Sequence, residues 1–398
     1  MTISTLSFQM NAVDQMDALQ QAMSKTQTQL STGKQIQSAA DNPVGMSQVV
    51  QLNTQLSASQ QYVTNGTLAT TGLNLETQAL TDATNTLQSA RSLIVEANNG
   101  SLNASQRQAI ATQLTQLQQQ LVSIGNRQDA QGNYLFSGYA SGTQPFAQNG
   151  TAVTYEGAAQ VNRVQLSADQ SISTGDTGGS VFMNIPAGNG TFTTSAGTAN
   201  IGSASLGTAT LSNPSAWVPG NYTITFGTSN SYQVTDSSGA TISSGTYTAD
   251  AGGNFTISFN GAQLAFSGAP AANDQFSVDS AGTASVFSTL ASAISALSTP
   301  NLNAGQMTTQ LNGALQQVDG ALNNFNQVSA SVGARLNAVS AASTTAQSTQ
   351  TSIQTTISTI SDTNYAAATT RLSTEELALQ AAQASYASMM QLTLFKYI

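Results

Sequence analysis

Residues with chemically useful side chains are few in this sequence. Acid–base catalysis needs two carboxylates placed together in a cleft. One adjacent pair, Glu375-Glu376, follows Ser373 and Thr374. This order favours a helix start, because Ser or Thr caps the helix and acidic residues are stabilised at its N-terminus. The 398 residues include no histidine and no cysteine, which excludes His-based triads, thiol nucleophiles, disulfides and Cys/His zinc sites.

A second group of acids, Asp250, Asp274 and Asp279, lies in a region rich in Ser, Thr and Gly. We expect such residues to behave like Asp236 in Asp236-Ser237-Ser238-Gly239, where aspartate commonly bonds the backbone of its own turn. Calcium binding is the alternative, but no Asp-x-Asp-x-Asp-Gly loop is present. The sequence also lacks a phosphate-binding loop and a Gly-x-Ser-x-Gly elbow.

Three aromatic residues, Trp217, Tyr222 and Tyr247, are candidates for a sugar-binding platform. We favour the commoner role for such residues, the core and rim of a small β-sandwich. With no catalytic constellation in the chain, we predict a protein that is not an enzyme and that uses no cofactor and no metal.

Composition excludes further classes of function. Only 7% of residues are charged, against about 25% in ordinary globular proteins, while 39% are hydrophobic. Nine basic residues against 18 acidic ones give a net charge of −9 and form no basic patch, so we expect no nucleic-acid partner. No apolar run is long enough for a Sec-type signal peptide or a membrane span, so we expect no membrane insertion and no cleaved signal.

The elements that position these residues begin with a long C-terminal helix. Its apolar residues recur in steps of three and four, the spacing of a heptad seam. They are Leu311, Leu315, Val318, Leu322, Phe325, Val332, Leu336, Val339, Ile353, Ile357 and Ile360. We expect the helix to continue through an Ala-rich tail to the last residues of the chain.

The N-terminal region repeats this pattern. Ile3, Leu6, Met10 and Val13 have helical spacing, and Gly33 interrupts the helix. Pro43 is well placed to open a second helix. That helix carries a seam from Val49 to Ile94 and should stop at Asn98-Asn99-Gly100. A third helix starts at a capping pair, Asn103 with Gln106, and we expect Gly132 to end it.

The middle of the chain changes to the period of β-strands. The segments 152–155 and 161–166 are expected to pair as a hairpin. Alternating apolar residues follow between residues 222 and 278. Asn260-Gly261 is the strongest hairpin signal, because both residues tolerate positive φ, and Ser238-Gly239 predicts a second turn.

Together these patterns predict an α+β fold: a long coiled-coil-like helical bundle formed by both chain ends, with an inserted antiparallel β-domain. We expect three domains. Residues 1–45 with 355–398 form a terminal helical domain, residues 46–185 with 284–354 form a helical rod with a β-hairpin, and residues 186–283 form the β-domain. The seam up to Val339 is expected to be ordinary core.

Three stretches resemble one known family. They are Gln29-Leu30-Ser31-Thr32-Gly33-Lys34 with Ala40-Asp41-Asn42-Pro43, then Gly132-Asn133-Tyr134-Leu135-Phe136-Ser137-Gly138-Tyr139 with Gln144-Pro145-Phe146, and finally Ala381-Ala382-Gln383-Ala384-Ser385-Tyr386 with Leu392-Thr393-Leu394-Phe395. The sequence is similar to the family of bacterial flagellar hook-associated protein 3, a relative of flagellin. The resemblance covers residues 1 to about 185 and about 284 to 398.

The resemblance implies a structural protein with a flagellin-like bundle. It would be secreted through the flagellar type III export channel and self-assemble as a ring at the hook–filament junction. Expected partners are the protein itself, hook-associated protein 1, flagellin and an export chaperone on the C-terminal region. The alternatives are a flagellin-type filament subunit and a surface adhesin whose β-domain binds glycans.

We expect the polymerisation interface to lie on the terminal helices, with the β-domain facing outward. The predicted interface residues are Ile3, Leu6, Met10, Val13, Ile353, Ile357, Ile360, Leu372, Leu379, Tyr386, Met389, Leu394 and Phe395.

Overall fold

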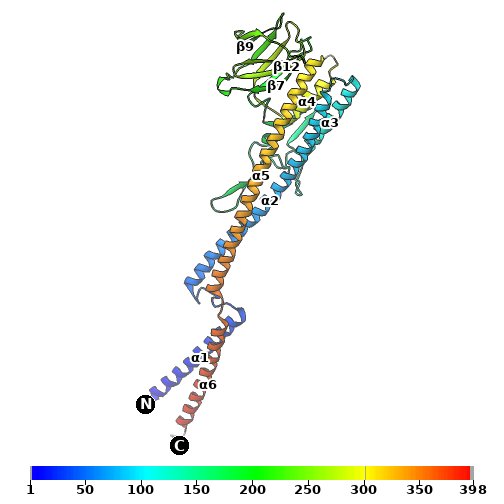
Figure 1. Ribbon diagram of the computed structural model, residues 1–398. Coiled ribbons are helices and arrows are strands. Elements are labelled where there is room, and N and C mark those ends of the chain that lie inside the picture. The colour runs from blue at the N-terminus through cyan, green and yellow to red at the C-terminus, as the bar shows by residue number, and fades with distance from the viewer. Residues whose placement is uncertain (1, 301, 395–398) are drawn as a thin grey trace. The chain divides into compact units, whose positions relative to one another are not determined.

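The computed structural model describes residues 2–300 and 302–394, with the side chains of all of these except residues 2–6, 389 and 391–394. The chain divides into two compact units (Figure 1). One unit comprises the residues up to Thr64 and those from Ala342 onward, and the other comprises Asn65–Ala341. Two long helices, α2 (Pro43–Ala97) and α5 (Ala304–Ser361), contribute residues to both units.

The other helices are α1 (Thr2–Thr32), α3 (Ala104–Gly125), α4 (Val286–Ser298) and α6 (Tyr365–Leu394). Several predicted boundaries are confirmed. Helix α1 ends just before Gly33, α2 begins at Pro43 and ends just before Asn98. Asn103 and Gln106 form the predicted capping box of α3, in which each side chain accepts the other residue's backbone N–H at 2.9 Å.

The end of α3 differs from the prediction, because the helix stops at Gly125 and not at Gly132. Gly125 lies so close to Phe146 that a Cβ there would be 2.6 Å from the ring. The side chain of Asn126 then accepts the backbone N–H of Phe146 and donates to its carbonyl, both at 2.9 Å. Contact with Phe146 thus turns the chain out of the helix before Gly132 is reached.

The predicted C-terminal rod is interrupted, because α5 ends at Ser361 and α6 begins at Tyr365. Asn364 starts the new helix by accepting the N–H of Ala367 at 3.2 Å. Glu375 and Glu376 therefore lie in the interior of α6, and the predicted helix start beside them is wrong. The Thr374 hydroxyl donates to the carbonyl of Thr370 at 2.9 Å instead of capping.

The helical part of the unit Asn65–Ala341 is built on buried seven-residue repeats. On α2 these residues are Leu73, Leu80, Leu87 and Ile94, and on α5 they are Leu311, Val318, Phe325, Val332 and Val339. Each fully buried Leu or Ile contributes about 1.5–3 kcal/mol. The predicted core seam is thus buried at these positions, while its other members Leu315, Leu322 and Leu336 are half-buried. The apolar face of α4 packs with α3 in the same unit.

An aromatic cluster occupies the centre of this unit. Phe136, from the signature stretch Gly132–Tyr139 that carries part of the family resemblance, lies 5.2 Å from Phe182 between ring centroids, and Phe182 lies 5.3 Å from Phe325. Phe146 and Phe287 join the cluster at 5.2 Å from each other. Since all five rings are fully buried, the signature stretch serves to fill the core between the helices and the loop after α3.

Two short hairpins replace the one that was predicted. Strand β1 (Phe146–Asn149) pairs with β2 (Ala152–Tyr155), and β3 (Arg163–Gln165) pairs with β4 (Ser171–Ser173). The expected pairing of 152–155 with 161–166 is wrong. Gly150, at φ +62°, closes the first hairpin one strand earlier, so β2 already has its partner.

The inserted β-domain consists of two antiparallel sheets, and β5 (Ile185–Pro186) pairs with β14 (Thr283–Ala284) where the chain enters and leaves it. The five-stranded sheet has the order β10 (Thr241–Thr246), β9 (Ser231–Asp236), β8 (Tyr222–Phe226), β13 (Gln275–Ser280) and β6 (Phe192–Ala196). The three-stranded sheet has the order β11 (Asn254–Phe259), β12 (Ala262–Ser267) and β7 (Ser205–Leu211).

Alternating residues of both sheets form one buried core, as the predicted period of two requires. The predicted turn Asn260-Gly261 joins β11 to β12 with φ values of +45° and +77°, and Gly239, at φ +84°, lies in the turn between β9 and β10. Helix α5 holds this domain through side-chain bonds, for example from Thr309 Oγ1, which accepts the N–H of Leu206 at 2.9 Å.

Asp250 acts within its own turn as predicted, whereas Asp274 also holds a distant loop and Asp279 lies in strand β13. Asp250 accepts the N–H groups of Gly252 and Asn254, both at 2.8 Å. The buried Asp274 accepts the N–H of Ile201 at 2.9 Å and of Ala271 at 2.8 Å. Within residues 2–300 and 302–394, no group of three or more Asp and Glu side chains is arranged to hold a metal ion.

Two of the candidate sugar-platform residues, Trp217 and Tyr222, pack together, and Tyr247 packs elsewhere on the β-core. Trp217 lies 5.0 Å from Phe192 and 5.7 Å from Tyr222 between ring centroids. Tyr247 instead stacks on Phe255 at 4.1 Å. These residues are therefore rim and core of the sandwich, the role that the sequence analysis favours.

A buried acid joins α2 to α5 in the unit Asn65–Ala341. Glu76 is 2% exposed, and its Oε1 accepts the N–H of Asp176 at 3.1 Å. The Asp176 carboxylate forms an ion pair with Arg335, which also donates to the carbonyl of Gly175. Burial raises the pKa of Glu76 to about 9; the charge of Asp176 adds to the shift and that of Arg335 opposes it.

Glu76 should therefore make stability depend on pH. The unfolded chain loses the Glu76 proton near pH 4.5 and the folded chain near pH 9, so stability should fall as pH rises between these values, by at most about 1.4 kcal/mol per unit for one proton. Glu76→Gln should flatten this slope and raise stability at pH 8, because the amide oxygen keeps the bond to Asp176. Urea unfolding from pH 5 to 9 measures the slope.

The matched control is Glu156→Gln, which changes an exposed glutamate of the same unit and should leave the curve nearly unchanged. An equal slope in the Glu76→Gln variant and the parent chain would show that Glu76 is ionised when folded.

Candidate assembly surface of the terminal helices

Helices α1 and α6 pack side by side within the same unit (Figure 1). Their half-buried residues follow the three-and-four spacing of a narrow seam: Ala12, Met16, Leu19, Met23 and Leu30 on α1, and Leu372, Leu379, Ala382 and Tyr386 on α6. Toward the chain ends, Gln9 Nε2 donates to Met390 Sδ at 3.3 Å. The two ends of the chain, far apart in sequence, therefore form one helical pair.

Both helices also carry exposed apolar side chains. Met10 is 61% exposed and Val13 39%, and both are among the predicted interface residues. Sequence reasoning missed Phe8, Leu377 and Met390, which are also exposed. Phe8, four residues before Ala12, and Met390, four residues after Tyr386, continue the seam toward the chain ends, so its spacing was the available signal for them, whereas Leu377 lies off the seam.

The remaining predicted interface residues fall into three groups. Ile353 is buried within its own chain, while Ile357 and Ile360 at the end of α5 are half-buried, as are Leu372, Leu379 and Tyr386 on α6. Ile3, Leu6, Met389 and Leu394 lie on α1 and α6, but their side chains are outside the described part. Phe395 lies outside the described residues altogether.

The helical pair is anchored where both chain segments cross. Lys34 and Asp362 form an antiparallel backbone bridge, and their side chains form an ion pair at 2.6 Å. Gln35 N donates to Ser361 O at 2.7 Å, and Thr363 N donates to Gly33 O at 2.9 Å. The Lys34 ammonium is the main cause that holds the pKa of Asp362 below its ordinary value. The Leu-Ser-Thr-Gly-Lys stretch is thus one half of a two-stranded crossing.

The Ala-Asp-Asn-Pro stretch shapes the loop between α1 and α2. Asp41 forms an ion pair with Lys25 at 2.8 Å and accepts the backbone N–H groups of Gln37 and Ser38. Lys25 first, and then these N–H groups, hold the pKa of Asp41 well below its ordinary value. Asn42 accepts the N–H of Gly45 at 2.9 Å and so caps α2 ahead of Pro43.

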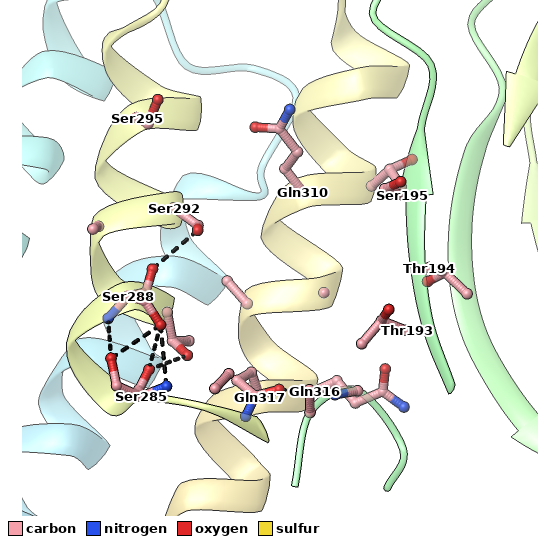
Figure 2. Close-up of a pocket in the computed structure, with 18 of the residues that line it drawn as sticks. Thr193, Thr194, Ser195, Ser285, Ser288, Ser292, Ser295, Gln310, Gln316 and Gln317 are labelled. Carbon is pink, nitrogen blue, oxygen red and sulfur yellow. Dashed lines mark hydrogen bonds between the residues drawn. The ribbon is translucent and has the colours of Figure 1, made fainter. Parts of the chain in front are cut away.

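A groove of about 770 Å³ between α4, α5 and β6 is a second candidate site, which sequence reasoning missed. Ser, Thr and Gln side chains line it, and Figure 2 shows that those of α4 bond mainly to one another. Ser288 N donates to Ser285 Oγ at 2.9 Å, and Gln317 accepts the N–H of Gly188 at 2.8 Å. With no charged residue in its lining, the groove contains no acid–base pair.

Gly33 is the residue at which a substitution should disturb the crossing most directly. It has φ +69°, and a Cβ there would lie 3.0 Å from the Tyr365 hydroxyl. Gly33→Ala should destabilise the crossing by about 1–2 kcal/mol. Amide hydrogen exchange at Gln35 and Thr363 should then become roughly 5- to 30-fold faster.

The control is Gly333→Ala, which adds a Cβ in the middle of α5 with nothing within 4 Å. Alanine is the better helix former by about 0.5–1 kcal/mol, so exchange at Gln35 should not change in this variant. Equal exchange at Gln35 in the Gly33→Ala and parent chains would contradict the role given to Gly33.

Family models match three parts of the chain. The N-terminal helical region of bacterial flagellin matches residues 3–141, and the C-terminal helical region matches residues 315–398. The D2-like domain of flagellar hook-associated protein 1 matches residues 195–280, which lie in the β-domain. No helix in the described part of the chain is both long and apolar enough to span a membrane.

Similar proteins agree with these matches. Flagellar hook-associated protein 3 of Escherichia coli is 35% identical over 157 residues, which are 39% of this chain and 49% of the relative, so the alignment spans about half of that protein. The flagellar junction protein FlgL of Legionella pneumophila is 30% identical with a TM-score of 0.67, over 74% of this chain and 99% of that one.

The crystal structure of FlgL from Xanthomonas campestris extends the likeness over most of the fold. It is 30% identical, with a TM-score of 0.71, over 77% of this chain. Because the match covers 99% of that structure and the chain has both helical regions of flagellin, the chain belongs to the family of flagellar hook-associated protein 3.

Proposed function

We propose that this chain is a structural subunit that joins the flagellar hook to the flagellin filament, and that it does so by ring-like self-assembly through its paired terminal helices. The observation that carries the proposal is the apolar surface left on that pair. Phe8, Met10 and Leu377 are 55%, 61% and 68% exposed. Covering such side chains with those of a neighbouring subunit would add about 1.5–3 kcal/mol for each one that becomes fully buried.

The proposed assembly surface contains the predicted residues of α1 and α6 together with Phe8, Leu377 and Met390. Ile353 is already covered by its own chain, so in this proposal it supports the end of α5 from within. Ile357, Ile360, Leu372, Leu379 and Tyr386 keep part of their surface for a neighbour. The side chains of Ile3, Leu6, Met389, Leu394 and Phe395 complete the surface as predicted from the sequence.

The proposal assigns a separate role to each of the three domains. Residues 1–45 with 355–398 polymerise, residues 46–185 with 284–354 form the rod, and residues 186–283 face outward. The last boundary is supported by the β-core, whose buried residues from Phe192 to Val278 pack with one another. The boundary between the terminal helical domain and the rod is supported by the crossing at Gly33 and Ser361. There the chain passes from α1 toward α2 and from α5 toward α6.

The partners in this assignment are other copies of the chain, hook-associated protein 1, flagellin and an export chaperone on the C-terminal region. The protein would act outside the cell in the flagellum. It has a structural and not a catalytic role in this proposal.

A flagellin-type filament subunit is the second candidate, because both flagellin helical regions match. The two assignments differ in the product of self-assembly. A junction subunit should stop at short rings, whereas a filament subunit should propagate. Electron microscopy of the purified, concentrated chain distinguishes these products.

Deleting the gene tests the assignment in the cell. The deletion strain should lose attached filaments and release flagellin monomer into the medium, and a plasmid copy of the gene should restore attachment. Electron microscopy and immunoblots of the medium measure both results. Filaments that stay attached in the deletion strain would rule out the junction role.

Polar substitution of the exposed face tests the surface. Met10→Gln with Val13→Gln should remove attached filaments while leaving the fold intact, because both residues are exposed in the single chain. The control pair is Ile201→Gln with Val218→Gln, at exposed apolar positions of the β-domain, which should keep attachment. Swimming assays report function and circular dichroism reports folding. Full attachment with the first pair would exclude these residues from the interface.

A further inference from the structure

Six Asn-Gly pairs give this chain a chemistry that does not depend on its assembly. They are Asn65-Gly66, Asn99-Gly100, Asn149-Gly150, Asn189-Gly190, Asn260-Gly261 and Asn312-Gly313. The backbone nitrogen of a glycine can attack the side-chain amide of the preceding asparagine, because glycine has no Cβ to obstruct the five-membered ring that forms. The local structure then decides which pair reacts.

Four of the pairs are held in place. Two lie inside α2 and α5, where the helix uses the backbone N–H of each glycine. Gly190 N donates to Ala187 O at 2.9 Å. Asn260 is half-buried at φ +45°, and its Nδ2 donates to the Tyr222 hydroxyl at 3.3 Å. These contacts keep each nitrogen or amide away from the geometry of attack.

Asn99-Gly100 differs in both reacting groups. It lies in the exposed loop between α2 and α3. In the described part of the chain, Gly100 N donates to no acceptor, and a Cβ at Gly100 would meet nothing within 4 Å. Asn99 Oδ1 accepts two hydrogen bonds from Ser101, from the backbone N at 3.2 Å and from Oγ at 2.9 Å. The nucleophile is free, and the carbonyl is already polarised.

We propose that Asn99 is a site of spontaneous deamidation assisted by Ser101. Gly100 N loses its proton and bonds to Asn99 Cγ, while the carbonyl electron pair moves to Oδ1. The N–H and O–H of Ser101 stabilise the oxyanion, since both donors already point at the atom on which charge develops. The oxyanion then collapses and the Cγ–Nδ2 bond breaks, while Nδ2 takes up from water the proton that Gly100 N gave to water, and leaves as ammonia.

Water completes the reaction by opening the resulting succinimide at either carbonyl, which gives aspartate or isoaspartate. The balance is one water consumed and one ammonia released, and nothing is oxidised or reduced. The product adds a negative charge two residues after the end of α2 at Ala97, where the helix dipole disfavours anions. Isoaspartate also lengthens the main chain of the turn that joins α2 to α3.

Asn149 provides an internal comparison, because it is exposed and followed by Gly150, and within the described residues its Oδ1 accepts no hydrogen bond. The full-length chain is incubated in mildly alkaline buffer, and amide-to-acid conversion at each asparagine is followed by peptide mass spectrometry. Conversion at Asn99 should be faster than at Asn149 by roughly 3- to 10-fold. This is less than the factor of about 10² or more for a buried oxyanion donor, because water can replace an exposed one.

Ser101→Ala removes the hydroxyl donor and keeps the N–H, so conversion at Asn99 should slow by roughly 3- to 10-fold while Asn149 is unaffected. An isoaspartate assay should find isoaspartate at Asn99, which direct hydrolysis of the amide would not produce. Conversion at Asn149 as fast as at Asn99, an unchanged rate in the Ser101→Ala chain, or aspartate alone would each overturn the proposal.

Discussion

The crossing of the chain at Gly33 and Ser361 is the constraint on which the terminal helices depend. Residues far apart in sequence meet there as a short antiparallel bridge, with the Lys34–Asp362 ion pair at its edge. An exposed ion pair contributes little by itself. The backbone bonds matter more, because they fix where α1 ends and α6 begins and so set which faces of the two helices meet. A sequence with both seams but without this crossing would leave their register undetermined.

Because the chain has few charged residues, amide and hydroxyl side chains connect its helices to its loops. Gln118, fully buried on α3, donates to the carbonyls of Thr151 and Phe287, and Asn126 bonds Phe146 in both directions. Such side chains satisfy the hydrogen-bonding groups of the loop backbone at a smaller desolvation cost than charged side chains would. The buried acid Glu76 fits this rule because its raised pKa keeps it neutral at physiological pH. Neutral polar contacts therefore connect helices to loops in the unit Asn65–Ala341, together with ion pairs such as Arg335–Asp176.

Periodicity predicted the elements, but not the contacts that end them. The seams of α2 and α5, the capping box of α3 and the Asn260-Gly261 turn depend on neighbouring residues, so they can be read from sequence. The end of α3 depends on the distant Phe146, which no local pattern reveals. Residues of the candidate site differ in the same respect. Met10 and Val13 could be predicted from the helical pattern, whereas the exposure of Leu377 depends on where α1 lies against α6.

The distribution of exposed apolar surface argues that specificity and assembly reside in different parts of the chain. The terminal helical regions of this chain match those of flagellin. A seam that this chain shares with flagellin cannot by itself distinguish a subunit that stops at a ring from one that propagates. The features beyond this seam are the Phe136 cluster, which fixes the loop after α3, and the β-domain held by α5 through Thr309. In the proposed junction role, a difference from a propagating subunit would have to come from such elements outside the shared seam.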